Sequence, residues 1–539
     1  MEALVGEEKT LESPQGDVRI QRGVSRILQL RGKERMEAIL SSDHPLEIFW
    51  FLPEEEAYFT IKEIGEYDAL PLLSLMSPAQ CQYLLDLELW KGYEIQLDRV
   101  ERWLPLLLSC DEEAIHRWLR SLDIDTLLLV LKKTIRLHLK DSDEPAVAQN
   151  ESTSTFTLDG TYFIEVLTPS LQNPVEQLLR VLAGLDLNLY RKVLHQVAWE
   201  IGAELEERAL HFREARLEDK GFPPMKEALS LYQYLNPRRL RKMLERKEIQ
   251  FPALPGEILL PSFPLVLRDQ GMFFSLCLRE LEEGALMDRL KMELTYMANQ
   301  VMVADQPERI DLPTLQASLR KVGRYLSVGL EVLSEGDVRK AREWMEEIPL
   351  KFLFQIGFGA SLELKWRAEK VWQKGWFSEK RIPLSFLGSP WEERIKGLLK
   401  KRPLFYDEDS ELGYREFHSL EEIRSLHRDL DKIEFLGRVF SSLPPFSYSE
   451  GLPWKTVLLN AYSQDHPELL SYRMPNFSEN RSHSINQVRQ EKAEIEDSFR
   501  NWLLQKIGSP LESDINLLED ITRSVLKEIG LAKDSYEGR

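Results

Sequence analysis

The feature that most constrains the fold is a helix-start phrase that recurs along residues 43–139, each time followed by apolar residues at helical spacing. At one restart, Ser77 and Gln80 stand three residues apart, which is the spacing of a capping box. Ser109 and Glu112 repeat this spacing. Short helices that restart after tight corners are typical of a helical array, whose neighbours cover one another's apolar faces. We therefore expect this region to be a helical-repeat domain.

The remaining sequence continues the helical pattern and predicts an all-α fold. The helical-repeat (superhelical) N-terminal domain is followed by further helical domains, with at most one small β-hairpin. That hairpin is expected at residues 156–164, because Asp159-Gly160 between β-prone residues suits a type I′ turn. A long helix is expected at about residues 188–217.

Length and local composition indicate several domains. The chain has 539 residues, which is too long for one hydrophobic core. Residues 141–155 are polar and lack hydrophobic periodicity, and residues 251–264 carry four prolines. The predicted organisation is a disordered tail (1–17), the helical-repeat domain (18–140), a linker (141–155), a second helical domain that opens with the hairpin (156–250), a third helical block (251–375), and a C-terminal helical and irregular region (376–539).

Charge and cysteine usage limit the class of protein. The net charge of −19 argues against nucleic acid as a partner, because phosphate binding needs clustered Lys and Arg. The three cysteines, Cys81, Cys110 and Cys277, show no CxxC spacing, which argues against a zinc site and a disulfide framework. The polar N-terminus does not resemble a secretory signal, and no apolar run is long enough for membrane insertion. We expect a cytoplasmic protein.

Two family resemblances can be stated. His44-Pro45 with Leu52-Pro53, followed by the later restarts, resembles the cytosolic N domain of MgtE-type magnesium transporters over about residues 40–140. That resemblance implies a right-handed superhelix of short helices. The transporter's membrane domain has no counterpart in this sequence, so magnesium transport is not implied.

The second resemblance covers most of the chain. It is carried by Leu205-Glu206-Glu207 with Arg216 to Pro223, by Tyr296 to Asp305, and by Pro349 to Phe358. These segments are similar to an uncharacterised bacterial family of large helical proteins that has only a domain-of-unknown-function label. The resemblance implies no activity, cofactor or catalytic residue.

Two clusters of acids and histidines are candidates for a metal or acid–base site. Glu200, Glu204, Glu207 and His211 lie on one side of the predicted long helix. The ferritin-like pattern needs Glu-x-x-His, and Arg208 stands where that glutamate would be, so we favour a solvated or salt-bridged face over a metal site.

The second cluster lies around a predicted helix start. Its members are His418, Glu421, Glu422, His427 and Asp431, at spacings that suit metal ligands or acid–base groups. We favour a simpler interpretation, in which Ser419 and Glu422 form a capping box.

Basic and aromatic residues provide a candidate partner surface. Its residues are Arg238, Arg239, Arg241 and Lys242, on a helix capped by Asn236, together with Trp372 and Trp376. Trp is frequent at the centre of protein interfaces. We nevertheless favour a solvated face for the basic residues and core packing for the tryptophans. The glycines at 357 and 359 do not continue into a nucleotide-binding motif, and we expect them to permit close helix packing.

The leading hypothesis is a non-enzymatic helical interaction or scaffold protein that binds another protein and needs no cofactor. One alternative is an enzyme with a cryptic carboxylate and histidine site. Another is a cation-responsive regulator, which only the transporter-like region suggests. The sequence does not fix the oligomeric state.

Overall fold

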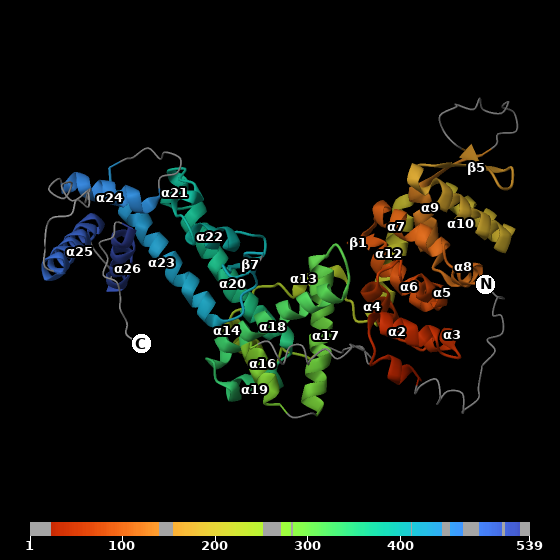
Figure 1. Ribbon diagram of the computed structural model, residues 1–539, viewed down its shortest axis with the longest axis horizontal. Helices are drawn as coiled ribbons and strands as arrows, with labels where there is room; N and C mark the ends of the chain where they lie inside the picture. The colour runs from red at the N-terminus through yellow and green to blue at the C-terminus, as the bar shows by residue number, and fades with distance from the viewer. Residues whose placement is uncertain are drawn as a thin grey trace. The chain divides into compact units, whose positions relative to one another are not determined.

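The computed structural model describes residues 23–139, 155–251, 271–281, 284–410, 412–444, 453–466, 485–508 and 512–528. Helices dominate these residues, and the strands form only small sheets, so the predicted all-α class is confirmed (Figure 1). The predicted tail at 1–17 and nearly all of the predicted linker, residues 141–154, lie outside the described residues. None of the described helices combines the length and apolar character that a membrane crossing requires.

The chain divides into two compact units, and each is described by itself. Among the described residues, unit 1 lies within 23–231 and 284–322, and unit 2 lies within 232–251, 271–281 and 323–528. The division falls inside helix α18 (Leu312–Ser334). The finer blocks expected from the sequence remain a prediction.

Unit 1 consists mostly of short helices around one core that extends from Ile27 to Leu319. Its helices are α2 (Gly32–Leu40), α3 (Pro45–Trp50), α4 (Glu54–Ile64), α5 (Leu70–Leu75), α6 (Pro78–Glu88), α7 (Leu97–Leu108), α8 (Glu112–Ser121), α9 (Ile124–Thr134), η1 (Pro169–Leu171), α10 (Gln172–Leu185), α11 (Leu187–Trp199), α12 (Gly202–Asp219), α13 (Met225–Ser230), α17 (Ala285–Asp305) and the first part of α18. A superhelical repeat of these helices remains a prediction.

The two capping boxes predicted within residues 43–139 have different outcomes. The box at α6 is confirmed, because Ser77 Oγ accepts from the Gln80 backbone and Gln80 Oε1 accepts from the Ser77 backbone. The box at Ser109 is wrong. Ser109 ends α7 and donates its hydroxyl to the Pro105 carbonyl at 2.8 Å, while Asp111 begins α8. A serine that ends one helix is not available to cap the next.

The β content exceeds the single hairpin that was expected. The described strands form three small antiparallel sheets. They pair β1 (Trp90–Lys91) with β2 (Glu94–Ile95), β5 (Tyr162–Val166) with both β3 (Ile135–Leu139) and β4 (Thr155–Phe156), and β6 (Phe405–Tyr406) with β7 (Tyr414–Arg415). Strands this short carry too little alternation to be seen in a sequence.

The expected hairpin at residues 156–164 is present, but its turn is not type I′. That turn needs positive φ at both central residues. Gly160 has φ of +69°, whereas Asp159 is not among the residues with positive φ. The Asp159 carboxylate instead accepts hydrogen bonds from the backbone of Thr161 and Tyr162, at 3.0 and 3.1 Å.

The long helix expected at 188–217 is two helices. Helix α11 ends at Trp199, Glu200 and Ile201 are extended, and α12 begins at Gly202. The Glu200 backbone has φ of −68° and ψ of 143°, which removes its side chain from the helical series. The break changes which acids share a face.

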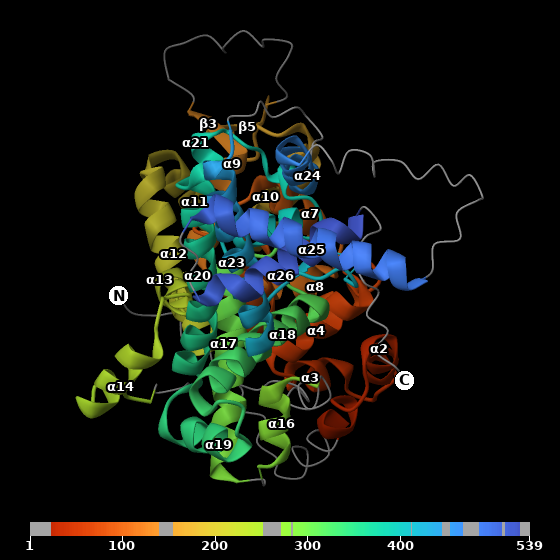
Figure 2. The ribbon, with the colours of Figure 1, turned by 90° about the vertical axis from the view of Figure 1, so that its left-hand side faces the viewer.

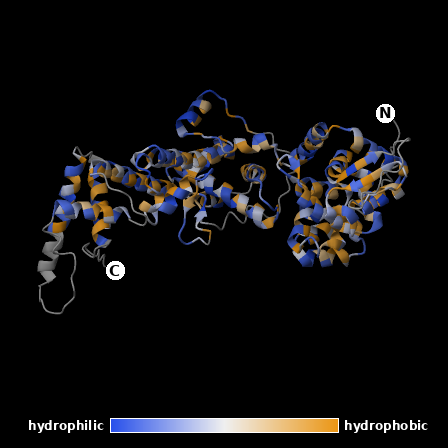
Figure 3. Cartoon of the chain, turned by 90° about the horizontal axis from the view of Figure 1, so that it is seen from above, coloured by the Kyte–Doolittle hydropathy of each residue, from blue (hydrophilic) through white to orange (hydrophobic). Residues whose placement is uncertain are grey.

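Unit 2 contains longer helices around a second core that extends from Val328 to Val525. Its elements are α14 (Pro237–Glu245), α16 (Phe273–Arg279), the second part of α18, α19 (Val338–Glu347), α20 (Leu350–Gln373), α21 (Trp376–Glu379), η2 (Leu384–Phe386), α22 (Trp391–Leu398), α23 (Leu420–Ser442), α24 (Trp454–Asp465), α25 (Ile485–Ile507) and α26 (Glu512–Glu528), with β6 and β7. Figure 2 shows α25 and α26 side by side against α23. In Figure 3, hydrophobic and hydrophilic residues alternate along the helices of both units, as amphipathic packing requires.

Candidate functional site

The acids and histidine of the first predicted cluster do not converge. Glu204, Glu207 and His211 are exposed on α12, away from the buried Leu205 and Ala209. Glu200 lies outside the helix and accepts a hydrogen bond from Arg208 at 2.7 Å. Among the described residues, no group of three or more His, Cys, Asp or Glu side chains is arranged to hold a metal ion.

The second cluster divides into three separate ion-pair groups at α23, one of which is the pair of Glu421 with Arg428 at 2.6 Å. Ser419 accepts from the Glu422 backbone and caps the helix, but the predicted capping box is not completed, because the Glu422 carboxylate accepts from the backbone of His418 and not from that of Ser419. The Glu422 carboxylate lies 2.6 Å from both His418 Nδ1 and Arg415 Nη2. Burial raises the pKa of Glu422, but the hydrogen bonds from His418 and Arg415 outweigh it, so the pKa is lowered.

His427 lies on the same helix but belongs to another group. Arg367 donates to the His427 carbonyl at 3.1 Å and pairs with Glu434 at 2.8 Å. Burial, together with the charge of Arg367, lowers the pKa of His427. The structure therefore does not bring His418 and His427 to one site.

The two predicted interface tryptophans pack within unit 2. Trp372 is half-buried and stacks on Phe377, with ring centroids 4.7 Å apart. Trp376 stacks on Phe440 at 5.3 Å. Both border the core of the unit, which is the packing that the sequence favoured.

The basic part of the predicted partner surface is exposed on α14. Asn236 caps this helix by accepting from the Arg239 backbone at 2.8 Å, and Leu240 is buried. All four predicted cations are exposed, and none of their side chains pairs with an acid among the described residues: Arg238, Arg239, Arg241 and Lys242. In Figure 2, α14 stands apart from the other helices of its unit. We call these four residues the basic face.

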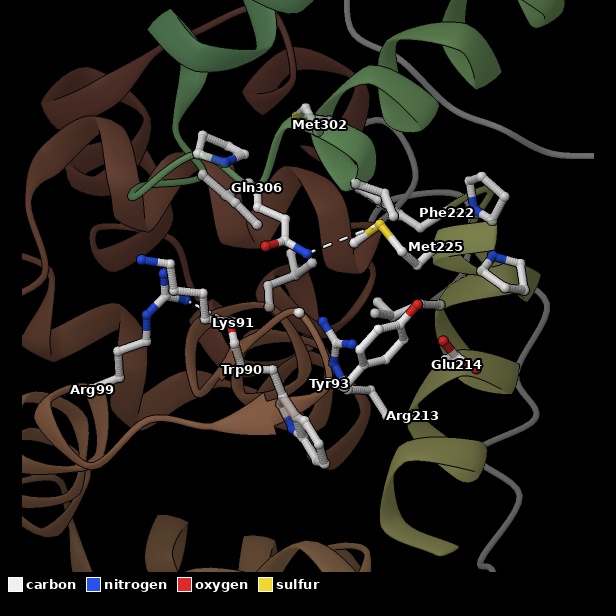
Figure 4. A pocket seen from close by; sticks show the side chains of 18 residues that line it. Trp90, Lys91, Tyr93, Arg99, Arg213, Glu214, Phe222, Met225, Met302 and Gln306 are labelled. Carbon is white, nitrogen blue, oxygen red and sulfur yellow. Dashed lines mark hydrogen bonds between the residues drawn. The ribbon is translucent and has the colours of Figure 1, made fainter. Parts of the chain in front are cut away.

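Sequence reasoning did not find a pocket of about 80 Å³ in unit 1. It lies between the β1–β2 hairpin, α12 with the turn after it, and the end of α17 (Figure 4). Gly92 has φ of +63° and lies at the hairpin tip, close to the Gln306 side chain. A Cβ at this position would lie 3.0 Å from Gln306 Nε2. Gly221, with φ of +79°, lies in the turn after α12 and precedes Phe222, which lines the pocket.

Three cations line this pocket without acid partners. Arg213 donates its Nε to the Asp86 carbonyl at 2.7 Å, and its guanidinium lies 5.3 Å from the Trp90 ring centroid. Burial lowers the pKa of Arg213 to about 10. Arg99 donates to the Trp90 carbonyl at 2.7 Å and the Glu308 carbonyl at 3.2 Å. Lys91 is exposed, and its ammonium makes no ion pair with a described residue.

The neighbouring arginines on α12 are paired, which sets Arg213 apart. Arg216 forms a bidentate pair with Asp86 at 2.7 and 2.8 Å. Arg208 forms one with Asp125 at 2.9 and 2.8 Å. Figure 4 shows Arg99 and Glu214 on opposite sides of the pocket, with Arg213 and Tyr93 between them. Glu214 is the acid among the lining residues.

The fold and these surfaces define an all-α protein of two helical units, with an exposed basic face on one and a basic pocket in the other. The chain belongs to the family of unknown function DUF6178, whose family model matches residues 13–459. The predicted membership of a domain-of-unknown-function family is thereby confirmed, whereas the MgtE-like resemblance is not. No curated protein and no solved structure matches the chain.

Proposed function

We propose that the protein is a non-catalytic interaction protein that binds an acidic surface of another protein through the basic face of α14. The observation that carries the proposal is the exposure of Arg238, Arg239, Arg241 and Lys242 without acid partners among the described residues. The chain as a whole has a net charge of −19, so a cluster of unpaired cations is out of keeping with the rest of its composition. Opposite charge on a partner gives specificity and speeds association.

The construction of α14 supports this function. Arg238, Arg241 and Lys242 are three and four residues apart, which places them on one side of the helix. Leu240 is the buried residue of this helix, and the Asn236 cap stabilises the first turn. The cations are therefore held on an ordered element. A cytoplasmic location fits the three free, buried cysteines and belongs to the same proposal.

Paired charge reversals test the proposal. The variant R238E/K242E changes the basic face, and R339E/K340E makes the same change in charge on α19 of the same unit, where both residues are exposed. Affinity capture from native lysate with cross-linking measures the complexes. A stoichiometric partner that the wild type and R339E/K340E retain, and that R238E/K242E loses, supports the proposal. Unchanged complexes with R238E/K242E, at unchanged helicity by circular dichroism, would overturn it.

A further inference from the structure

We propose that the pocket of unit 1 binds a small oxyanion that carries two negative charges, either a phosphate monoester or a dicarboxylate. The pocket is lined by Lys91, Arg99 and Arg213, which have no acid partner among the described residues, and by a single carboxylate, Glu214. Two positive charges in the pocket are therefore not compensated by its own walls. This site is independent of the basic face, because it uses other residues in the other unit.

Arg213 provides the strongest argument for an anion. Its Nε is used in the hydrogen bond to the Asp86 carbonyl, whereas its two terminal nitrogens have no acceptor among the described residues. A partly desolvated cation without an anionic partner is unfavourable, and an anion that accepts from those nitrogens offsets the cost. The nearby carboxylate of Asp86 does not accept from these nitrogens, because Arg216 binds it in the bidentate geometry.

The other two cations have complementary roles. Arg99 is fixed by its hydrogen bonds to the carbonyls of Trp90 and Glu308, so it contributes a charge that does not move. Lys91 is exposed at the hairpin tip and has a flexible side chain, which suits the closure of the pocket over a ligand. An exposed ammonium, a fixed guanidinium and a partly buried guanidinium then surround one anion.

The size and walls of the pocket restrict the ligand. A volume of about 80 Å³ holds only a few water molecules, so only a small molecule or group is enclosed. Tyr93, Phe222, Met225 and Met302 supply apolar wall next to the cations. This combination favours an anion attached to a short organic skeleton over a bare, fully hydrated ion.

Calorimetric titration of the full chain tests the site. The probes are glycerol 3-phosphate and succinate, each at fixed ionic strength, with sodium chloride as the reference for non-specific ion effects. We expect saturable binding of one equivalent of at least one probe, and an affinity that falls as salt is added. The probe that binds more tightly identifies the class of oxyanion.

Matched substitutions connect the binding to the pocket. R213Q and K91Q are each expected to weaken binding about tenfold, because each removes one charge-assisted contact. R120Q and K192Q remove exposed cations elsewhere in unit 1 and are expected to leave the affinity unchanged. If R213Q does not fold, K91Q still tests the site. The Lys91 side chain has no partner among the described residues, so we expect this substitution to leave the fold intact.

Two results would overturn the proposal. One is the absence of saturable binding of both probes. The other is binding that R213Q and K91Q weaken no more than R120Q and K192Q do. Loss of anion binding in R213Q and K91Q, with capture of a partner through α14 unchanged, would support the site. The proposed function is tested separately by the R238E/K242E variant.

Discussion

At the scale of single residues, the arginines of α12 show how burial and pairing give one residue type different roles. Arg208 and Arg216 neutralise acids of neighbouring helices, whereas Arg213, between them, donates to a carbonyl and lies over the Trp90 ring. The sequence shows three arginines on one helix but does not show which acids reach them. Asp86 and Asp125 come from segments more than eighty residues away.

The buried pair between Asp86 and Arg216 should contribute strongly to stability. The Asp86 side chain is 1% exposed, and burial raises its pKa against the opposing effect of Arg216. We expect R216A to lower the free energy of unfolding by about 3–5 kcal/mol, because it leaves a buried carboxylate unpaired. Urea denaturation followed by circular dichroism at neutral pH measures the change.

The exposed pair of Arg180 and Glu176 on α10 provides the control for R216A. The Arg180 side chain is 61% exposed, so R180A should cost less than about 1 kcal/mol. Equal losses of unfolding free energy in the two variants would contradict the conclusion that the buried Asp86 carboxylate needs Arg216 as its partner.

At the scale of elements, two glycines allow α18 and α20 to cross within unit 2. A Cβ at Gly329 would lie 2.0 Å from the Leu353 carbonyl oxygen, and a Cβ at Gly357 would lie 2.0 Å from that of Tyr325. The backbones of the two helices are therefore in direct contact. The expectation that Gly357 permits close helix packing is confirmed. The sequence did not identify Gly329 as its counterpart.

We expect G357A to destabilise unit 2 by about 1–3 kcal/mol or more, because the added methyl group pushes the two helices apart. The measurement is thermal or urea unfolding. G184A, on the exposed side of α10, is the matched control, because nothing lies within 4 Å of a Cβ at that position. It should be neutral or stabilise by up to about 1 kcal/mol, since alanine is the better helix former. A G357A variant as stable as wild type would contradict the close crossing.

At the scale of the whole molecule, the chain has two separate hydrophobic cores, one in each unit. Chains of this length usually unfold through intermediates, domain by domain. The residue and element predictions can therefore be combined, because Arg216 lies in unit 1 and Gly357 in unit 2.

We expect scanning calorimetry to resolve more than one unfolding transition. R216A should lower the midpoint of one transition and G357A that of another, because each variant weakens a different core. A single transition that both variants shift together would show instead that the two units unfold as one.

The sequence alone determined the helical class, several helix starts and the family, because capping, periodicity and composition act over a few neighbouring residues. It also identified the basic cluster on α14. Only the tertiary structure decided which side chains meet. The break at Glu200 separated the predicted acid cluster, and three distant segments built the pocket around Arg213. Those outcomes depend on contacts between residues far apart in the chain, which no local pattern encodes.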